Sequence, residues 1–220
     1  MTEEGAANRS RPRRSPAARP TDDQLLGAAR MVFAERGYVQ ATMEAIAEAA
    51  DSTKPTLYAH FGDKAALYRA VFGREVEALR DWLLRAYEEA AGLPLAQQVR
   101  GYVMALFRYA TAHADSFRIL FDQHGADELD PVRMSVVDTI SDRVAEQIRR
   151  YLTELGREPG PSVRLLAEML VGLVGGAARH VRRTKNLDPV VAGELATTFI
   201  MAALTNLDHS LLDPIDHPAP

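Results

Sequence analysis

The sequence predicts an all-α fold. Apolar residues recur at spacings of three and four along most of the chain, which is the period of a helix buried on one side. Glycine and proline fall between these segments, where helices end. No segment shows the strict alternation of a half-buried strand, and there is no internal repeat. We expect about nine helices in 220 residues, which form a small N-terminal head and a larger body.

The first expected helix begins after Thr21. Thr21 and Gln24 have the spacing of a capping box, in which each side chain bonds the other residue's backbone N–H. Gly37 is expected to end this helix, because glycine adopts the left-handed conformation of a C-terminal cap without strain. The apolar face between them consists of Leu25, Ala29, Val32 and Phe33.

Two shorter helices are expected next. Thr42 can cap the first of them, and Asp51-Ser52 should stop it, with an Asx-type side-chain bond holding the turn. Thr53 can cap the second, and Pro55 falls in its first turn, where a missing N–H costs little. The apolar stripe of the first helix is formed by Met43, Ile46, Ala47 and Ala50.

This pair of helices predicts a helix-turn-helix motif in residues 42–61. The alternative is an ordinary αα-hairpin within a helical core. The second helix, however, leaves Lys54, Tyr58 and His60 outside its apolar face, and hydroxyl groups lie at its N-terminal end. These polar groups can bond DNA phosphates and base edges, so we favour a DNA-binding motif over the hairpin.

Three segments of the head share one joint spacing. They are L-x-x-A-A-x-x-x-F-A-E-R-G-Y in residues 25–38, T-x-x-x-I-A-x-x-A in 42–50, and T-K-P-T-L-Y-x-H-F-x-x-K-x-x-L in 53–67. This spacing resembles the TetR family of transcriptional regulators. Asp51 and Ser52 depart from the family pattern, which often has glycine and a small aliphatic residue at these positions.

The resemblance implies a function. It implies a homodimeric DNA-binding repressor that a small, largely apolar ligand releases from a palindromic operator. An activator and a ligand-independent regulator of the same family are the alternatives. Base contacts are expected at the start of the second helix, from Thr53, Lys54, Pro55 and Thr56. Phosphate contacts are expected from Thr42, Tyr58, His60 and Lys64.

Charge is distributed unevenly near the N-terminus. Residues 21–64 contain four Lys or Arg and seven Asp or Glu, a net of −3, whereas residues 1–20 contain five Arg and two Glu, a net of +3. We expect residues 1–20 to form a flexible Arg- and Pro-rich arm that reaches a phosphate or a minor groove. A tail without function is the alternative. The arm's expected DNA contacts are Arg11, Arg13 and Arg14.

The predicted domains are therefore the arm (1–20), the DNA-binding domain (21–64) and a ligand-binding and dimerisation domain (65–220). A long helix, Lys64–Ala91, is expected to join the last two without a linker. Further helices are expected over residues 95–113, 115–123, 131–156, 161–185 and 189–207.

The last two of these helices predict a subunit interface. Residues 161–185 carry two apolar stripes, and a helix that is apolar on two sides is buried on two sides. Two such helices from each chain would form a four-helix bundle across a two-fold axis. Completion of a monomeric core is the alternative. The expected interface residues are Leu166, Leu170, Val174, Ala178, Leu195, Phe199 and Ala202.

The body also contains aromatic and methionine residues. Such residues at helical spacing are more often part of a core than of a pocket, but the resemblance implies that some of them line a ligand cavity. The pocket candidates are Trp82, Tyr102, Leu106, Phe107, Phe117, Phe121, Met134, Met169 and Leu173.

Other classes of protein fit the sequence less well. The chain has no cysteine, which excludes disulfides and thiolate metal sites, and a cytoplasmic protein is expected. It has no signal peptide and no apolar run long enough to cross a bilayer, so no membrane partner is expected. Catalytic and nucleotide-binding motifs are missing, and the histidines lack metal-site spacing. We therefore expect no enzyme, metal or cofactor; a helical enzyme and a protein-interaction module are the minor alternatives.

Overall fold

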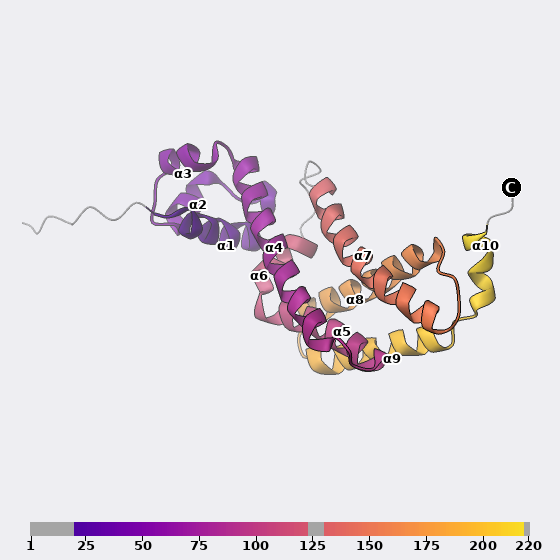
Figure 1. Ribbon diagram of the computed structural model, residues 1–220. Coiled ribbons are helices and arrows are strands. Elements are labelled where there is room, and N and C mark those ends of the chain that lie inside the picture. The colour runs from indigo at the N-terminus through magenta and orange to yellow at the C-terminus, as the bar shows by residue number, and fades with distance from the viewer. Residues whose placement is uncertain (1–19, 123–129, 218–220) are drawn as a thin grey trace, which may run out of the picture.

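The computed structural model describes residues 20–122 and 130–217, apart from the side chains of residues 130–136. Within these residues the fold is all-helical, which confirms the predicted fold class. Figure 1 shows a small head at one end and a larger helical body at the other. One long helix, α4 (Lys64–Ala90), runs from the head into the body, as the sequence predicted.

The head is built from α1 (Asp22–Gln40), α2 (Met43–Ala49) and α3 (Lys54–Phe61). The capping box of α1 is present: Thr21 N–H donates to Gln24 Oε1 at 2.9 Å, and Gln24 N–H donates to Thr21 Oγ1 at 3.3 Å. At Gly37 the backbone leaves the helical conformation with φ of 77°. The short turn after it brings the chain round to α2.

The turn between α2 and α3 differs from its expected form. Ser52 N–H donates to Ala47 O at 2.9 Å and Asp51 N–H donates to Glu48 O at 3.1 Å, the two backbone bonds of a Schellman motif. Asp51 occupies the left-handed position of this motif, with φ of 46°. Backbone bonds therefore close the turn, in place of the Asx-type bond that we expected, and Asp51 takes the glycine position.

The described part of the body consists of α4 and seven further elements. They are α5 (Leu95–Ala112), α6 (Ala114–Phe121), α7 (Asp130–Glu154), α8 (Ser162–Arg183), α9 (Pro189–Thr205) and the C-terminal η2 (His209–Leu211) with α10 (Asp213–Asp216). The five helices from α5 to α9 match the predicted segments to within about two residues at each end. The sequence analysis did not anticipate η2 and α10.

The C-terminal segment closes the far end of the body. The carboxylate of Asp216 in α10 accepts hydrogen bonds from Ser162 N–H at 2.7 Å and from Ser162 Oγ at 2.9 Å. Asp216 thereby caps α8, whose own N-cap residue is a proline without a side-chain cap. No single described helix is long and apolar enough to cross a membrane; only α9 taken with residues 209–216, across a 77° bend, reaches that length and composition.

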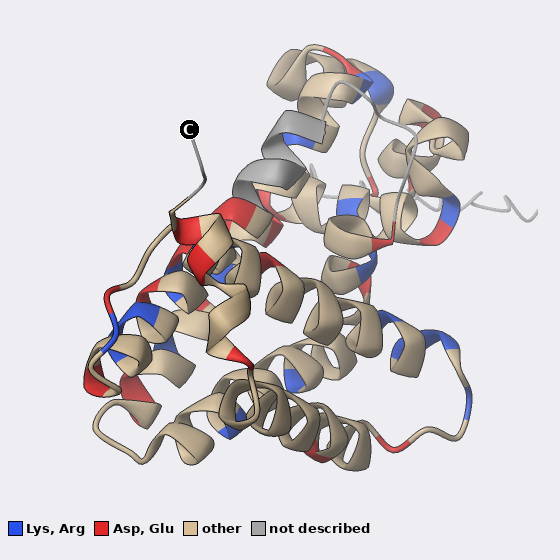
Figure 2. Cartoon of the chain, turned by 90° about the vertical axis from the view of Figure 1, so that its right-hand side faces the viewer, with Lys and Arg blue, Asp and Glu red and all other residues tan. Residues whose placement is uncertain are grey.

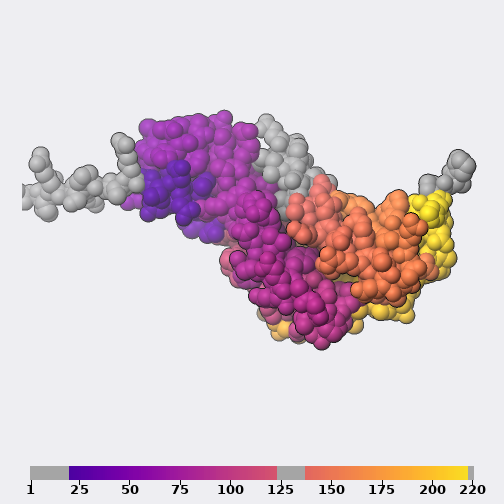
Figure 3. Space-filling model, in the orientation of Figure 1, coloured from indigo at the N-terminus to yellow at the C-terminus, as the bar shows by residue number. Residues whose placement is uncertain are grey.

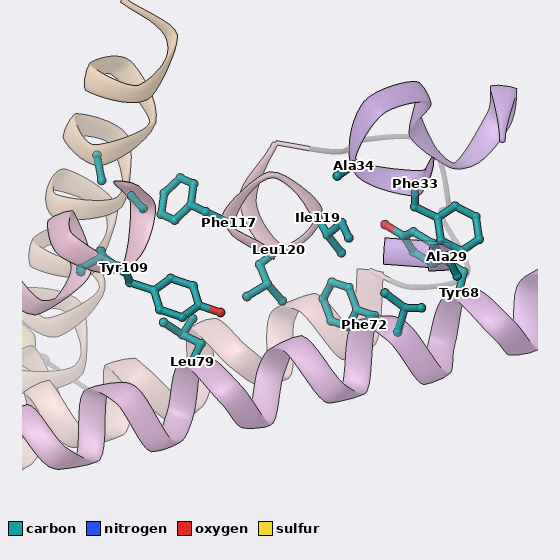
Figure 4. Packing of buried hydrophobic residues seen from close by; sticks show 14 of the residues in the cluster. Ala29, Phe33, Ala34, Tyr68, Phe72, Leu79, Tyr109, Phe117, Ile119 and Leu120 are labelled. Atoms are coloured by element: carbon teal, nitrogen blue, oxygen red, sulfur yellow. The ribbon is translucent and has the colours of Figure 1, made fainter. Parts of the chain in front are cut away.

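Head and body share one hydrophobic core. α6 lies against both α1 and α4, so the side chains of Ile119 and Leu120 approach those of Phe33 and Phe72 (Figure 4). The row of buried residues continues along α4 to Leu79 and into the body. A change in the packing of the body can therefore move the head through these contacts.

Candidate nucleic-acid interface and ligand cavity

The recognition helix α3 is fixed on one side and exposed on the other. Leu57 is completely buried and anchors the helix, whereas the Tyr58 side chain, one position later, is 49% exposed. Thr53 caps the helix by accepting from Thr56 N–H at 3.4 Å, and the two threonine hydroxyls lie 2.9 Å apart. The N-terminal end of α3 thus presents hydroxyl groups and Pro55 to solvent, as the sequence predicted for base contacts.

Lys54 is not a free cation on this surface. Its ammonium group forms an ion pair with the carboxylate of Glu44 in α2, and both side chains are exposed. Hydrogen bonding to Glu44 raises the pKa of Lys54 above its usual value, and the same bond lowers the pKa of Glu44. Before Lys54 can donate to a base, it must exchange Glu44 for that base or share its donors between them.

The structure places the four candidate phosphate contacts in different settings. Tyr58 is exposed, and Thr42 caps α2 by accepting from Ala45 N–H at 3.2 Å. His60 Nδ1 lies 2.5 Å from Asp22 Oδ1. Lys64 Nζ donates to Tyr38 O at 2.9 Å and to Ala41 O at 3.1 Å, which leaves one N–H of the ammonium group for another partner.

These contacts give Lys64 and His60 a structural role in the head. Lys64 also lies over the Tyr38 ring, 4.5 Å from its centre, and so holds the turn after Gly37 against α4. The sequence pattern showed a lysine at the right spacing but could not show that backbone carbonyls surround it. The remaining candidates, Arg11, Arg13 and Arg14, lie outside the described residues. Figure 2 shows acidic segments among the basic ones over the head.

A cavity of about 120 Å³, here called the inner cavity, lies in the body between α4, α5, α7, α8 and α9. Aliphatic and tyrosine side chains dominate its wall, and none of its described lining residues is charged. Three of the predicted pocket residues, Tyr102, Leu106 and Phe121, line it. Other lining residues were not among the pocket candidates predicted from the sequence: Leu83 and Tyr87 on α4 and Ile140, Val144, Ile148 and Tyr151 on α7.

The other pocket candidates lie elsewhere. Phe107 and Phe117 are fully buried core residues, and Leu173 packs against the same core. Trp82 donates from Nε1 to Ala105 O at 2.8 Å and packs edge-on against Tyr109, so it fills a helix–helix contact. These four residues were predicted to line a pocket because helical spacing identifies a buried face of a helix, but it does not show where a cavity remains next to that face. Met169 is 61% exposed, and the side chain of Met134 lies outside the described residues.

The two apolar stripes of α8 face in opposite directions. Leu166, Leu170 and Val174 pack within their own chain, and Ala178 is buried in its core, so these four predicted interface residues belong to the protomer interior. The stripe that faces solvent is the other one, with Leu165 and Met169. The three predicted interface residues of α9 face solvent: Leu195 is 70% and Phe199 60% exposed, and Ala202 is exposed as well.

We call this exposed surface the α8–α9 face and define it by Leu165, Met169, Val191, Leu195, Phe199 and Ala202. α9 has a single charged residue, Glu194, which Arg100 of α5 binds with Nε–Oε1 of 2.7 Å. The bottom of the body, where α9 lies, accordingly shows little charge in Figure 2.

Comparison with known proteins identifies the family. Residues 25–71 match the model of bacterial regulatory proteins of the tetR family. The chain is 30% identical, over 185 residues, to the HTH-type transcriptional activator FasR of Mycolicibacterium smegmatis, a match that covers 84% of this chain and 83% of the relative. The protein belongs to the TetR family. It is therefore a DNA-binding transcriptional regulator and not an enzyme.

Other similar proteins also match this chain over most of its length. The HTH-type transcriptional repressor BepR of Brucella suis is 27% identical over 200 residues, covering 85% of this chain and 93% of that protein. A TetR-like regulator from Rhodococcus sp. RHA1 superposes with a TM-score of 0.68 at 26% identity, over 88% of this chain and all of the other. The regulator FadR from Bacillus subtilis, solved with stearoyl-CoA, shares the fold with a TM-score of 0.69 at 18% identity, over 82% and 97% of the two chains.

Proposed function

We propose that this TetR-family regulator acts as a homodimer that binds a palindromic operator and is controlled by a small apolar ligand. The observation that carries the proposal is the α8–α9 face. Leu195 and Phe199 of α9, and Met169 of the neighbouring helix α8, expose most of their apolar surface there. Contiguous apolar surface of this kind marks a protein–protein contact.

A second copy of the chain fits this face better than another partner. A two-fold axis brings the same surface of each copy together, so the surface must match itself. The α8–α9 face meets this condition because the residues that define it are all apolar and the single charged residue of α9 is already paired within the chain. Two copies would then present two α3 helices to DNA, and a symmetric pair of recognition helices binds a palindrome.

The exposed surface of the head suggests which residues contact bases and which contact phosphates. We assign base contacts to Thr53, Lys54, Pro55 and Thr56, and phosphate contacts to Thr42, Tyr58 and, with one remaining N–H, Lys64. The described head has no net positive charge to attract DNA, so affinity depends on the arm, with Arg11, Arg13 and Arg14, and on dimerisation. The domain division at residues 20 and 64 is part of this proposal.

Ligand control is supported by the inner cavity. An uncharged wall, mainly of aliphatic and tyrosine side chains, suits an apolar ligand. α4 contributes Leu83 to this wall and begins at Lys64, directly after the recognition helix, so a ligand that shifts α4 also moves the head. The fold is shared with FadR, which was solved with stearoyl-CoA, and this agrees with a ligand-binding body. The ligand must favour one position of α4 by a few kcal/mol.

Repression is the primary proposal for the direction of control. A dimer bound at a promoter blocks the access of RNA polymerase, and for this it needs no additional binding surface. Activation is the second candidate, because the activator FasR is 30% identical to this chain over most of both lengths. Transcription in vitro from a promoter with the bound site separates them: repression predicts less transcript with added protein, activation predicts more.

The function is tested by a gel mobility shift with the DNA upstream of the protein's own coding sequence. We expect a shifted complex that excess unrelated DNA of equal length and base composition does not displace. Equal displacement by both DNAs would overturn sequence-specific binding. Sedimentation of the free protein tests the dimer separately.

A further inference from the structure

A second cavity adjoins the inner cavity. This outer cavity, of about 230 Å³, lies between α4 and α7 and shares Leu83, Tyr87 and Ile140 with the inner one. Figure 3 shows the two helices side by side at the surface of the body. Each volume falls below the range of about 300–1,000 Å³ that is usual for small-molecule sites, so a ligand that spans both cavities fits better than a ligand in either one.

The two cavities differ in chemistry. The described lining of the inner cavity has no charged residue, and its two amide side chains are Gln98 and Gln147. Gln98 donates to Leu93 O at 2.7 Å and accepts from the Tyr102 hydroxyl at 3.2 Å. The outer cavity is lined by Glu77, Arg80 and Arg143 in addition to apolar residues. A molecule that occupies both must therefore have an apolar end and a polar or charged end.

The sign of the charged end follows from the ion pairs. Arg80 binds Glu77 at 2.5 Å and approaches Asp81 at 3.5 Å, so its charge and that of Glu77 offset each other. Arg143 is exposed and forms no ion pair with any carboxylate in the described part of the chain. Among the charged residues described in the lining of the outer cavity, Arg143 is thus the one without an ion pair, and its guanidinium group favours an anion with matching oxygen acceptors.

Tyr87 lies where the inner and outer cavities meet. Its ring packs on that of Tyr102 with centroids 4.0 Å apart, and it lines both cavities. Burial raises the pKa of Tyr87 to about 12, while the charge of Arg143 acts in the opposite direction, which places Arg143 within electrostatic reach of the junction. The phenol ring of Tyr87 therefore lies where the uncharged lining of the inner cavity meets the charged lining of the outer one.

We propose that the two cavities form one site for a single-chain anionic amphiphile. Its alkyl or acyl chain occupies the inner cavity, and its acidic group pairs with Arg143 in the outer one. This inference rests on the proposed ligand control of the body and adds the chemical class of the ligand and the residue that recognises its head group.

The test is calorimetric titration of the intact protein with three twelve-carbon probes below their micelle concentrations: dodecanoate, dodecanol and dodecyltrimethylammonium. Dodecanoate is expected to bind once per chain, and to bind about tenfold or more tightly than the other two, because a charge-assisted bond to Arg143 is added to the same chain contacts. Equal affinity for all three, or tighter binding of the cationic probe, would overturn the assignment of an anionic ligand.

Variants identify the site. Arg143→Gln is expected to weaken dodecanoate about tenfold and to leave dodecanol unchanged. Arg85→Gln, a matched loss of an exposed α4 arginine that lines neither cavity, should change neither. Val174→Phe, which fills the inner cavity, should weaken both probes. An equal loss in the two arginine variants would contradict a specific role of Arg143.

This experiment also separates the ligand class from the proposed function. If dodecanoate binds as predicted but leaves DNA binding unchanged, the amphiphile site stands and ligand control of DNA binding fails. If dodecanoate does not bind while a compact, uncharged apolar compound such as naphthalene binds and changes DNA affinity, ligand control stands and the amphiphile class fails.

Discussion

Arg118 Nη1 in α6 donates a hydrogen bond of 2.9 Å to the backbone carbonyl of Ala34 in α1. Ala34 lies in the last turn before the break at Gly37, where backbone carbonyls lose their helical partners. The bond therefore ties the end of the first head helix to the body. At its other end, α6 leads to Asp122, which pairs with Arg182 and Arg183 of α8. α6 thus links the helices around the cavity to the head.

We predict that Arg118→Ala loosens this link. The Ala34 carbonyl loses a charge-assisted bond in a partly buried setting, so the free energy of unfolding should fall by about 1–2 kcal/mol. Amide hydrogen exchange should speed up in the last turn of α1. Arg108→Ala, the loss of an exposed α5 arginine, is the control and should leave exchange in α1 unchanged. Unchanged exchange in both variants would refute a tie between α6 and the head.

The ion pair between Lys54 and Glu44 predicts an unusual gain of function. In Glu44→Gln, Lys54 is released and an acidic group is removed from the recognition surface. DNA affinity at low salt should therefore rise by roughly two- to fivefold, the scale of an exposed charge interaction. Glu48→Gln makes the same change of charge on α2, at an exposed residue that does not pair with Lys54. A gain of equal size in Glu48→Gln would show that total charge, and not release of Lys54, is responsible.

Lys54 itself should affect specificity. We predict that Lys54→Ala relaxes the preference at one base position, because a lysine donor to guanine is lost, whereas Tyr58→Phe weakens all sequences about equally. Binding measured against a set of single-base operator variants checks both. The assignment of Lys54 to base contact fails if Lys54→Ala lowers affinity for every variant by the same factor.

The α8–α9 face gives a prediction about assembly. Leu195→Glu places a charge where the second copy would bury it, so the dimer dissociation constant should rise by about 100-fold or more. Leu155→Glu is matched, since Leu155 is 51% exposed but directly follows α7 and is not one of the residues that define the face. Sedimentation velocity over a concentration series measures both. If the two variants dissociate alike, or neither does, the α8–α9 face is not the dimer contact.

Asp51 gives a prediction about stability. Its φ of 46° is left-handed, a conformation that costs most residues about 1–2 kcal/mol and glycine very little. Asp51→Ala should therefore lower the free energy of unfolding by about 1 kcal/mol, and Asp51→Gly should not lower it. Urea denaturation of the two variants decides this, and equal loss in both would mean that a side-chain contact of Asp51 holds the turn.

Much of the head could be predicted from the sequence because its signals are local. Thr21 and Gln24 are three residues apart, and Thr53 caps a helix that starts at the next residue, so short-range rules identify them. Gly37 marks a backbone break by its residue type alone. These features needed no knowledge of how the helices pack.

The body could be predicted only as far as its helices. Leu165 and Leu166 are adjacent and equally apolar, and only packing decides that Leu166 faces inward while Leu165 faces solvent. The same holds for the bond between Asp216 and Ser162, which are 54 residues apart. Cavity residues such as Tyr87 depend on where three or more helices leave space, and helical periodicity does not contain that information.

The central claim is that two copies of the chain bind DNA as a symmetric pair through α3. Selection of bound sequences from a randomised double-stranded DNA library, followed by measurement of the protein-to-DNA ratio in the complex, tests it most directly. We expect an enriched motif with two-fold symmetry, bound by an even number of chains, that Leu195→Glu no longer selects and Leu155→Glu still selects. An asymmetric motif bound by a single chain, or no enriched motif, would contradict it.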